Sequence, residues 1–193
     1  MGAPQKALSR ISADEYLALE ELAPHKHEFL NGIMYTLNGL PATSTVGGTR
    51  LHNLIALAVA SSLRAQLKGT RCQVLMNDVK LHIEAADAYF YPDVMVTCDE
   101  RDLAADLVMR APTLVVEVLS PSTSTFDRAD KFAAYRTLPS LAQYVLVASI
   151  ERRIDVFTRA ENWTATTAAN AGDVLLTSLG VSLRFDDIYT GVA

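Results

Sequence analysis

The sequence has few cysteines and no long apolar run. Cys72 and Cys98 lie far apart with no C-x-x-C spacing, which argues against a disulfide framework or a zinc knuckle. We expect both to be reduced core thiols of a cytoplasmic protein. No apolar stretch approaches the length of a membrane span, and the N-terminal MGAPQKALSR lacks the apolar segment of a signal peptide. We therefore expect no membrane association.

Motifs of several common enzyme classes are also missing. There is no G-x-x-x-x-G-K-[ST] or G-x-G-x-x-G phosphate loop and no G-x-S-x-G nucleophile elbow. The chain is not basic either, because 17 Lys and Arg face 22 Asp and Glu, for a formal net charge of −5. Proteins that bind nucleic acid through phosphate contacts alone are normally basic. A nucleic-acid role must then depend on a local basic surface or on a bound metal.

What the sequence does contain is enough apolar material for one core. Its 193 residues are 50% hydrophobic and 20% charged, which indicates a single folded domain over residues 1–193. A capping box at Ser12–Glu15 begins a short helix, and Asn31-Gly32 indicates a hairpin that pairs Leu30 with Ile33 and Glu28 with Tyr35. Further helices are expected at residues 49–67 and 126–138, with loops at 84–90 and 99–106. Strands are expected near residues 73–76, 78–83, 91–97, 114–119, 143–148, 154–158, 163–167 and 181–185.

The stretch from residue 111 to 136 organises this pattern. It runs as a strand that is apolar on both faces, a breaker at Ser120-Pro121, and a helix. The next strand follows this helix directly, so the two strands are expected to be parallel neighbours. The fold class is therefore α/β with a mixed sheet. Glu117 lies in the middle of the central strand, where an isolated ionised carboxylate is costly unless it is paired or bound to a metal.

Three acids stand in apolar strands: Glu28, Asp93 and Glu117. If these strands are neighbours, the carboxylates converge, and clustered carboxylates are usually neutralised by a hard divalent cation. The Val118 carbonyl would add an oxygen ligand. Lys131, about one turn into the following helix, could reach the same place and help offset charge on a phosphoryl oxygen.

Each of these residues also has a plain structural explanation. Asp93 could terminate a strand after Pro92, and Glu117 could pair with an arginine in the core. Lys131 lies four residues after Asp127, a common pair on a helix surface. Glu28 could be a solvated hairpin acid. Composition and periodicity alone leave these alternatives open.

The same residues carry a resemblance to a known family. The runs YPDVMV (91–96), LVVEVLSPST (114–123), D-x-x-x-K-x-x-x-Y (127–135) and YVLV (144–147) resemble the restriction-endonuclease-like Uma family, long catalogued as a bacterial domain of unknown function, within the PD-(D/E)XK nuclease superfamily. The likeness extends over nearly the whole chain, including the hairpin and the start of the helix near His52. The resemblance implies a restriction-endonuclease-like fold, with a mixed central β-sheet flanked by helices and an N-terminal helix and β-hairpin.

The resemblance also implies a function and a set of roles. The chain would be a metal-dependent endonuclease that hydrolyses DNA, with Mg²⁺ as cofactor, Mn²⁺ as a substitute, and a homodimer as its assembly. Asp93, Glu117 and the Val118 carbonyl would be metal ligands, and Glu28 a supporting acid. The lysine usual two places after the glutamate is absent, because Leu119 stands there, and Lys131 would replace it. Candidate substrate contacts are His52, Ser120, Ser122 and Tyr135.

Two further departures from the family pattern, Asn31 and Ala148 in place of acids, fall outside the proposed ligands. The missing lysine and the acidic net charge keep an alternative open. A catalytically inactive nuclease-fold protein could act as a nucleic-acid-binding or oligomeric interaction module.

Overall fold

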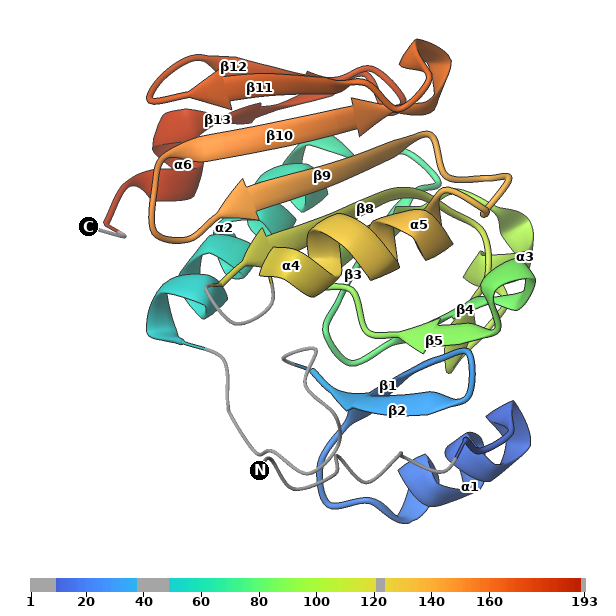
Figure 1. Ribbon diagram of the computed structural model, residues 1–193. Coiled ribbons are helices and arrows are strands. Elements are labelled where there is room, and N and C mark those ends of the chain that lie inside the picture. The colour runs from blue at the N-terminus through green and yellow to red at the C-terminus, as the bar shows by residue number, and fades with distance from the viewer. Residues whose placement is uncertain (1–9, 38–48, 121–123, 192–193) are drawn as a thin grey trace, which may run out of the picture.

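The computed structural model describes residues 10–37, 49–120 and 124–191 (Figure 1). It is a mixed α/β fold, as predicted, built from two larger sheets and a small one. Ser12 caps the first helix with the predicted capping box. The helices are α1 (Ala13–Leu22), α2 (Arg50–Gln66), α3 (Glu100–Leu103), α4 (Ser124–Phe126), α5 (Phe132–Tyr135) and α6 (Phe185–Tyr189), with short turns η1 (Glu84–Ala86) and η3 (Arg159–Glu161) and a π-helical turn η2 (Asp127–Lys131).

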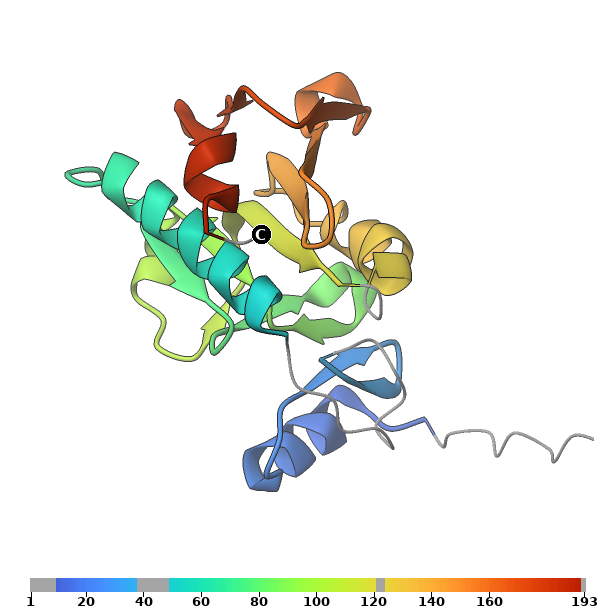
Figure 2. The same ribbon diagram turned by 90° about the vertical axis from the view of Figure 1, so that its left-hand side faces the viewer.

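The larger sheet has six strands in the order β11-β10-β9-β8-β6-β3. Strands β8 and β9 are parallel, as predicted, and the segment α4-η2-α5 connects them, while the other neighbours are antiparallel. Figure 2 shows α2 and α5 on opposite sides of this sheet. The strand bounds are β3 (Gln73–Met76), β6 (Val94–Thr97), β8 (Pro112–Leu119), β9 (Gln143–Ala148), β10 (Arg153–Thr158) and β11 (Ala165–Ala169).

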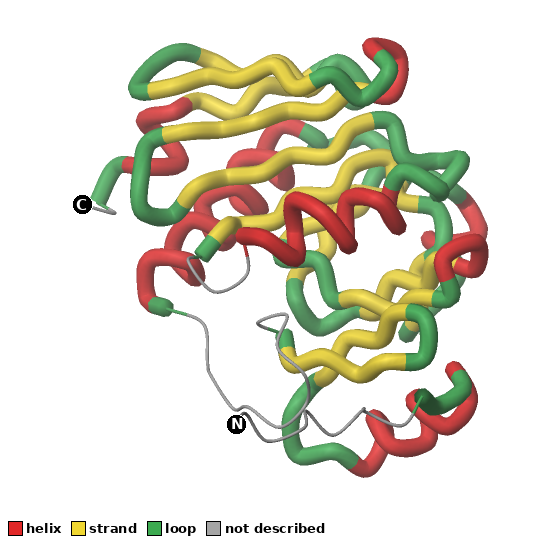
Figure 3. The backbone as a smooth tube through the Cα atoms, in the orientation of Figure 1, coloured by secondary structure: helices red, strands yellow, loops and turns green. Residues whose placement is uncertain are grey.

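A second sheet of five strands has the order β2-β1-β5-β4-β7 (Figure 3). The hairpin β1–β2 has the predicted register, with Leu30 opposite Ile33 and Glu28 opposite Tyr35. Asn31 and Gly32 both have positive φ, at 48° and 86°, as the predicted two-residue turn requires. The strands are β1 (His27–Leu30), β2 (Ile33–Thr36), β4 (Lys80–Ile83), β5 (Ala88–Phe90) and β7 (Val108–Met109), and β12 (Asp173–Leu176) with β13 (Val181–Arg184) forms a separate pair.

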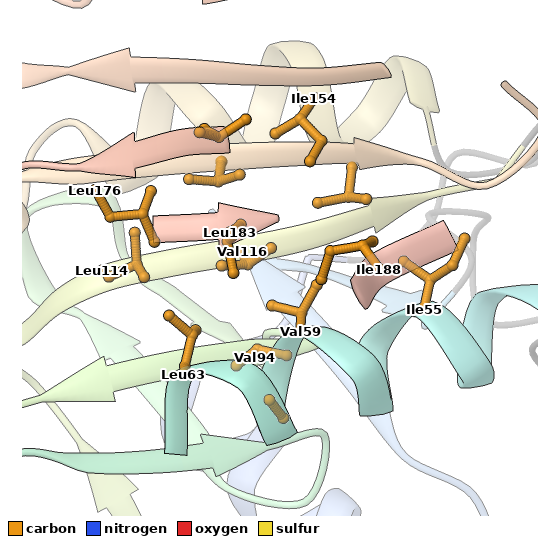
Figure 4. Packing of buried hydrophobic residues seen from close by; sticks show 14 of the residues in the cluster. Ile55, Val59, Leu63, Val94, Leu114, Val116, Ile154, Leu176, Leu183 and Ile188 are labelled. Carbon is orange, nitrogen blue, oxygen red and sulfur yellow. The ribbon is translucent and has the colours of Figure 1, made fainter. Parts of the chain in front are cut away.

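Strand β8 is buried on both faces because its side chains alternate between two cores. Leu114, Val116 and Val118 pack with α2, α6 and β13 (Figure 4), whereas Val115 and Leu119 pack with α5 and the second sheet. Glu117 alternates in step with Val115 and Leu119, two residues from each. It therefore faces the side of the sheet on which α5 and the hairpin lie.

The prediction of reduced cysteines is wrong. Strands β3 and β6 pair with Gln73 opposite Thr97, so the preceding Cys72 meets the following Cys98, and the two form a disulfide. The two cysteines are 26 residues apart in the sequence, and only the register of β3 against β6 brings them together. Because disulfides are rare in cytosolic proteins, the premise behind the predicted cytoplasmic location is removed.

Other differences concern short elements. The predicted loop at residues 84–90 contains η1 and strand β5, and the irregular stretch 99–106 contains α3. Strands β7 and β12 and helix α6 were not predicted, since each is five residues or shorter and carries little periodicity. In the part of the chain described, every helix is too short or too polar to cross a membrane.

Candidate active site

The site forms where β6 and β8 separate. The last pair of their ladder is Val94 with Val116, so the next residues, Asp93 and Glu117, stand opposite each other. There the ladder is replaced by side-chain bonds: the Asp93 N–H donates to Glu117 Oε2 at 3.2 Å, and the Val118 N–H donates to Asp93 Oδ2 at 2.7 Å. Pro92, which has no N–H, precedes this point. Strand register thus brings the two acids together.

The π-helical turn supplies the cation. It carries Asp127 and Lys131, both at most 4% exposed, so their pairing is buried and not the surface contact that helix spacing alone suggests. Lys131 Nζ lies 2.8 Å from Glu28 Oε1, 3.2 Å from Glu117 Oε1 and 3.4 Å from Asp127 Oδ1. Single π-helical turns within α-helices recur at functional sites.

Glu28 comes to the site from the hairpin. Residues 91–93 pass from β5 in one sheet to β6 in the other, and the Tyr91 N–H donates to Glu28 Oε1 at 3.1 Å. Glu28 is fully buried, so it is not a solvated hairpin acid. Its Oε2 has no hydrogen-bond partner among the described residues. The structure therefore brings together Glu28, Asp93, Glu117 and Lys131.

The candidate substrate contacts lie in different surroundings. His52, in the first turn of α2, is half-buried, with Nε2 3.0 Å from Asp93 Oδ2. Tyr135 is fully buried, and its hydroxyl donates to Glu117 Oε1 at 2.7 Å. It therefore positions this carboxylate and is not exposed to a substrate. Ser120 is buried just past the end of β8. Ser122 lies outside the described residues.

Sequence reasoning missed a supporting network on α1. The Glu20 carboxylate accepts the His27 N–H at 2.9 and 3.1 Å and the Tyr91 hydroxyl at 3.0 Å. It thereby fixes the two backbone segments that carry Glu28 and Asp93. Its signal in the sequence was weak: Tyr16 and Glu20 are four residues apart and share the buried face of α1.

The charges of the site do not balance among the described residues. Three buried carboxylates, from Glu28, Glu117 and Asp127, contact the one Lys131 ammonium, and a fourth, the half-buried Asp93, pairs with His52. Burial raises the pKa of Glu28 to about 7 even though Lys131 opposes the shift. Burial also raises the pKa of Glu117 well above its usual value, and the neighbouring acids add to this. The excess negative charge favours uptake of protons or of a cation.

Neighbouring acids raise the pKa of both basic groups of the site, Lys131 and His52. Burial alone would lower the pKa of Lys131, but Glu117, Glu28 and Asp127 outweigh it and raise the pKa well above its usual value. Burial likewise opposes protonation of His52, yet the hydrogen bond and charge of Asp93 raise its pKa.

The donor set fits a hard divalent ion. Asp93 and Glu117 offer neighbouring carboxylates, and the Val118 carbonyl would add a third oxygen. Within the described ranges, no three His, Cys, Asp or Glu side chains could enclose an ion by themselves. Mg²⁺ does not need such a cage, because it commonly binds one or two carboxylates and keeps several waters. The unpartnered Glu28 oxygen and the negative excess are consistent with a nearby cation.

The fold is that of a nuclease-like protein. A crystal structure from Anabaena variabilis, described as "a putative nuclease belonging to DUF820", matches with a TM-score of 0.75 at 16% identity and covers 95% of this chain and 99% of that one. The chain belongs to the Uma2 family, described as "Putative restriction endonuclease", whose family model matches residues 13–186. The resemblance noted from the sequence is confirmed.

Two relatives from Synechocystis sp. are similar over most of their length. The "Uncharacterized protein slr1290" is 34% identical over 192 residues, 98% of this chain and 97% of the relative. The "Uncharacterized protein sll1609" is 32% identical over 147 residues, 75% and 78% respectively.

Proposed function

We propose that the chain is a metal-dependent endonuclease that hydrolyses DNA phosphodiester bonds, with Mg²⁺ as cofactor and Mn²⁺ able to substitute. Membership of the Uma2 family supports the reaction class. The observation that carries the proposal is one buried cluster built from four separate segments of the chain: Lys131 contacts Glu28 and Glu117, and the Asp93 N–H donates to Glu117.

Asp93, Glu117 and the Val118 carbonyl would hold the ion. When bound, a divalent ion polarises a phosphoryl oxygen, generates a nucleophilic water and offsets developing charge. The chain's own groups position the ligands: Tyr135 and Lys131 fix Glu117 Oε1, and His52 with the Val118 N–H fixes Asp93 Oδ2. Preorganised ligands of this kind need no rearrangement during the reaction.

Lys131 and Glu28 would have separate roles in the reaction. Because the pKa of Lys131 is raised well above its usual value, its ammonium stays protonated and would offset negative charge developing on the phosphoryl group. Glu28 would orient the attacking water or bind a second ion through Oε2, which has no hydrogen-bond partner among the described residues. Cutting both strands of a duplex requires two sites, so we further propose that the chain acts as a homodimer.

A cleavage assay tests the proposal. Purified protein is incubated with supercoiled plasmid and with linear duplex, in Mg²⁺, in Mn²⁺ and in chelator. We expect nicked or linear products only with metal, none from Glu117→Gln, and unchanged cleavage by Glu161→Gln, which makes the same change at an exposed site. Equal cleavage by wild type and Glu117→Gln would remove the mechanism.

One observation favours a second function, that of an inactive nucleic-acid-binding or interaction module. The Lys131 ammonium already contacts three carboxylates, and Leu119 stands where the superfamily has its lysine. Calorimetric titration of wild type and Glu117→Gln with Mg²⁺ and Mn²⁺ separates the two functions. Heat of binding that is lost in Glu117→Gln supports the enzyme, and no binding at millimolar metal supports the module.

A further inference from the structure

Positive charge is concentrated in one part of this acidic chain. No Asp or Glu occurs between Glu28 and Asp78, and α2 contains no acid at all. The basic residues of this segment are Arg50, Arg64, Lys68 and Arg71. In a chain of formal net charge −5, such a segment is a local basic surface of the kind that phosphate binding requires.

The helical period places most of these cations on a single face. At 3.6 residues per turn, five positions on α2 and just past its end lie within about 60° of one another around the axis. All five are exposed, and we call them the α2 stripe: Arg50, Leu57, Ser61, Arg64 and Lys68. The opposite face carries Ile55, Val59 and Leu63, which are fully buried against the sheet (Figure 4). The stripe therefore lies on the side of α2 that faces solvent and not the sheet.

The helix that carries the stripe begins next to the candidate active site. Thr49 caps α2, and His52, in its first turn, lies 3.0 Å from Asp93. The other end opens into a hollow of about 790 Å³, whose lining includes Arg64, Lys68, Thr70 and Gln73. The 17 residues of α2 extend over about 25 Å, the length of about seven base pairs of duplex DNA.

The cations of the stripe are available to a ligand. Arg50, Arg64 and Lys68 form no ion pair with any residue that the structure describes. Arg71, beside the stripe, has a 3.7 Å contact with Glu100, but both side chains are more than two-thirds exposed, so the pair is weak. Unpaired surface cations gain affinity for DNA by releasing its condensed counterions.

We propose that the α2 stripe binds the phosphate backbone of duplex DNA, so that the duplex lies along the outer face of α2. This inference rests on the proposed function, because it names how that substrate is held. It also shows how an acidic chain can bind DNA: α2 itself contains no acid, and the contact is local.

Salt-dependent binding tests the inference. A fluorescent duplex is titrated in chelator, without cleavage, between about 50 and about 200 mM KCl, and the logarithm of the affinity is plotted against that of the salt concentration. Arg64→Gln/Lys68→Gln should weaken binding and make the slope shallower by about 1.8, since each phosphate contact contributes about 0.9. The control Arg10→Gln/Arg136→Gln removes the same charge from exposed sites elsewhere and should leave the slope unchanged.

The outcomes separate this inference from the proposed function. Equal slopes for the two double variants, or no salt-dependent binding by wild type, overturn the stripe. Tighter binding of an RNA duplex overturns the assignment to DNA. A metal-dependent nuclease whose stripe variant cleaves like wild type at every salt concentration refutes the stripe alone. Stripe-dependent binding without cleavage in Mg²⁺ or Mn²⁺ supports the stripe and refutes the nuclease.

Discussion

Asp93 and Glu117 stand opposite each other where β6 and β8 separate, and each side chain accepts a hydrogen bond from the backbone of the other's strand. These two bonds take the place of ladder bonds, so the carboxylates are held by the same register that builds the sheet. Neighbouring like charges at such a point are costly unless a cation offsets them. The sheet thus holds the two carboxylates that we propose as metal ligands.

The first prediction concerns Asp93→Asn. The amide oxygen can still accept the Val118 N–H, so the fold should persist with an unchanged melting temperature. A neutral ligand should lose Mg²⁺ binding, and loss of several kcal/mol of charge stabilisation should lower kcat by about 10²-fold or more. Calorimetry and plasmid cleavage measure the two effects. The control is Asp106→Asn, the same change at an exposed position. Unaltered Mg²⁺ affinity in Asp93→Asn would contradict the assignment.

The second prediction concerns the disulfide between Cys72 and Cys98. It closes a loop with a sequence separation of 26, for which chain entropy predicts a stabilisation of about 3.5 kcal/mol. Urea unfolding should show this loss in Cys72→Ala/Cys98→Ala, and a reductant should bring wild type down to the same stability. Metal binding should be unaffected, because the disulfide joins the end of β6 remote from Asp93. A reductant without effect on wild type would show that the thiols are unpaired in solution.

The third prediction concerns pH. In the metal-free protein, burial raises the pKa of Glu28 from 4.5 to about 7 and that of Glu117 well above 4.5. At a pH between the ordinary and the raised pKa of these groups, the folded state holds more protons than the unfolded state. The free energy of unfolding should therefore fall as pH rises through this range. Lys131 stays protonated throughout and adds no slope.

Urea unfolding in chelator, from about pH 5 to about pH 8, measures this slope. Glu28→Gln should make it shallower, because the amide cannot titrate, whereas Glu161→Gln at an exposed site should not. Stability that rises through the window would mean that Glu28 and Glu117 are ionised and fully compensated without metal.

Features of the fold that depend on local sequence patterns were predictable, and those that depend on contacts between distant segments were not. Period-two runs and the Asn31-Gly32 turn predicted the hairpin register and the parallel pair β8–β9 correctly, because these depend on local patterns. The strand at residues 88–90 was missed, since three residues carry too little periodicity to recognise. The disulfide was missed because it follows from pairing between β3 and β6, a non-local property.

The sequence drew attention to four residues that the structure brings together, Glu28, Asp93, Glu117 and Lys131, but it did not give their geometry. Glu28 and Glu117 were conspicuous in the sequence as acids in apolar strands, and in the structure both side chains are buried. Asp127 was taken only as a surface partner of Lys131, because an α-helical wheel cannot anticipate the π-helical turn that buries both. Glu20 escaped notice because its partners, His27 and Tyr91, become neighbours only after the hairpin docks on α1.

The last prediction concerns Lys131, which joins three buried acids. Lys131→Met leaves Glu28, Glu117 and Asp127 without their shared cation, and breaking a buried ion cluster in this way should cost roughly 3–5 kcal/mol near pH 8. The cost should be smaller near pH 5, because the acids with raised pKa can then protonate. Urea unfolding at both pH values measures the difference.

Addition of Mg²⁺ makes this test specific to the site. If the acids surround a divalent-ion site, the ion should stabilise Lys131→Met at least as much as wild type, because it then neutralises carboxylates that no ammonium compensates. Lys131→Arg keeps the charge in a larger group and should lose less stability at pH 8 than Lys131→Met. An equal loss at both pH values, with no response to Mg²⁺, would mean that Lys131 fills the core by its stem alone. That outcome would leave the four acids without an electrostatic connection to catalysis.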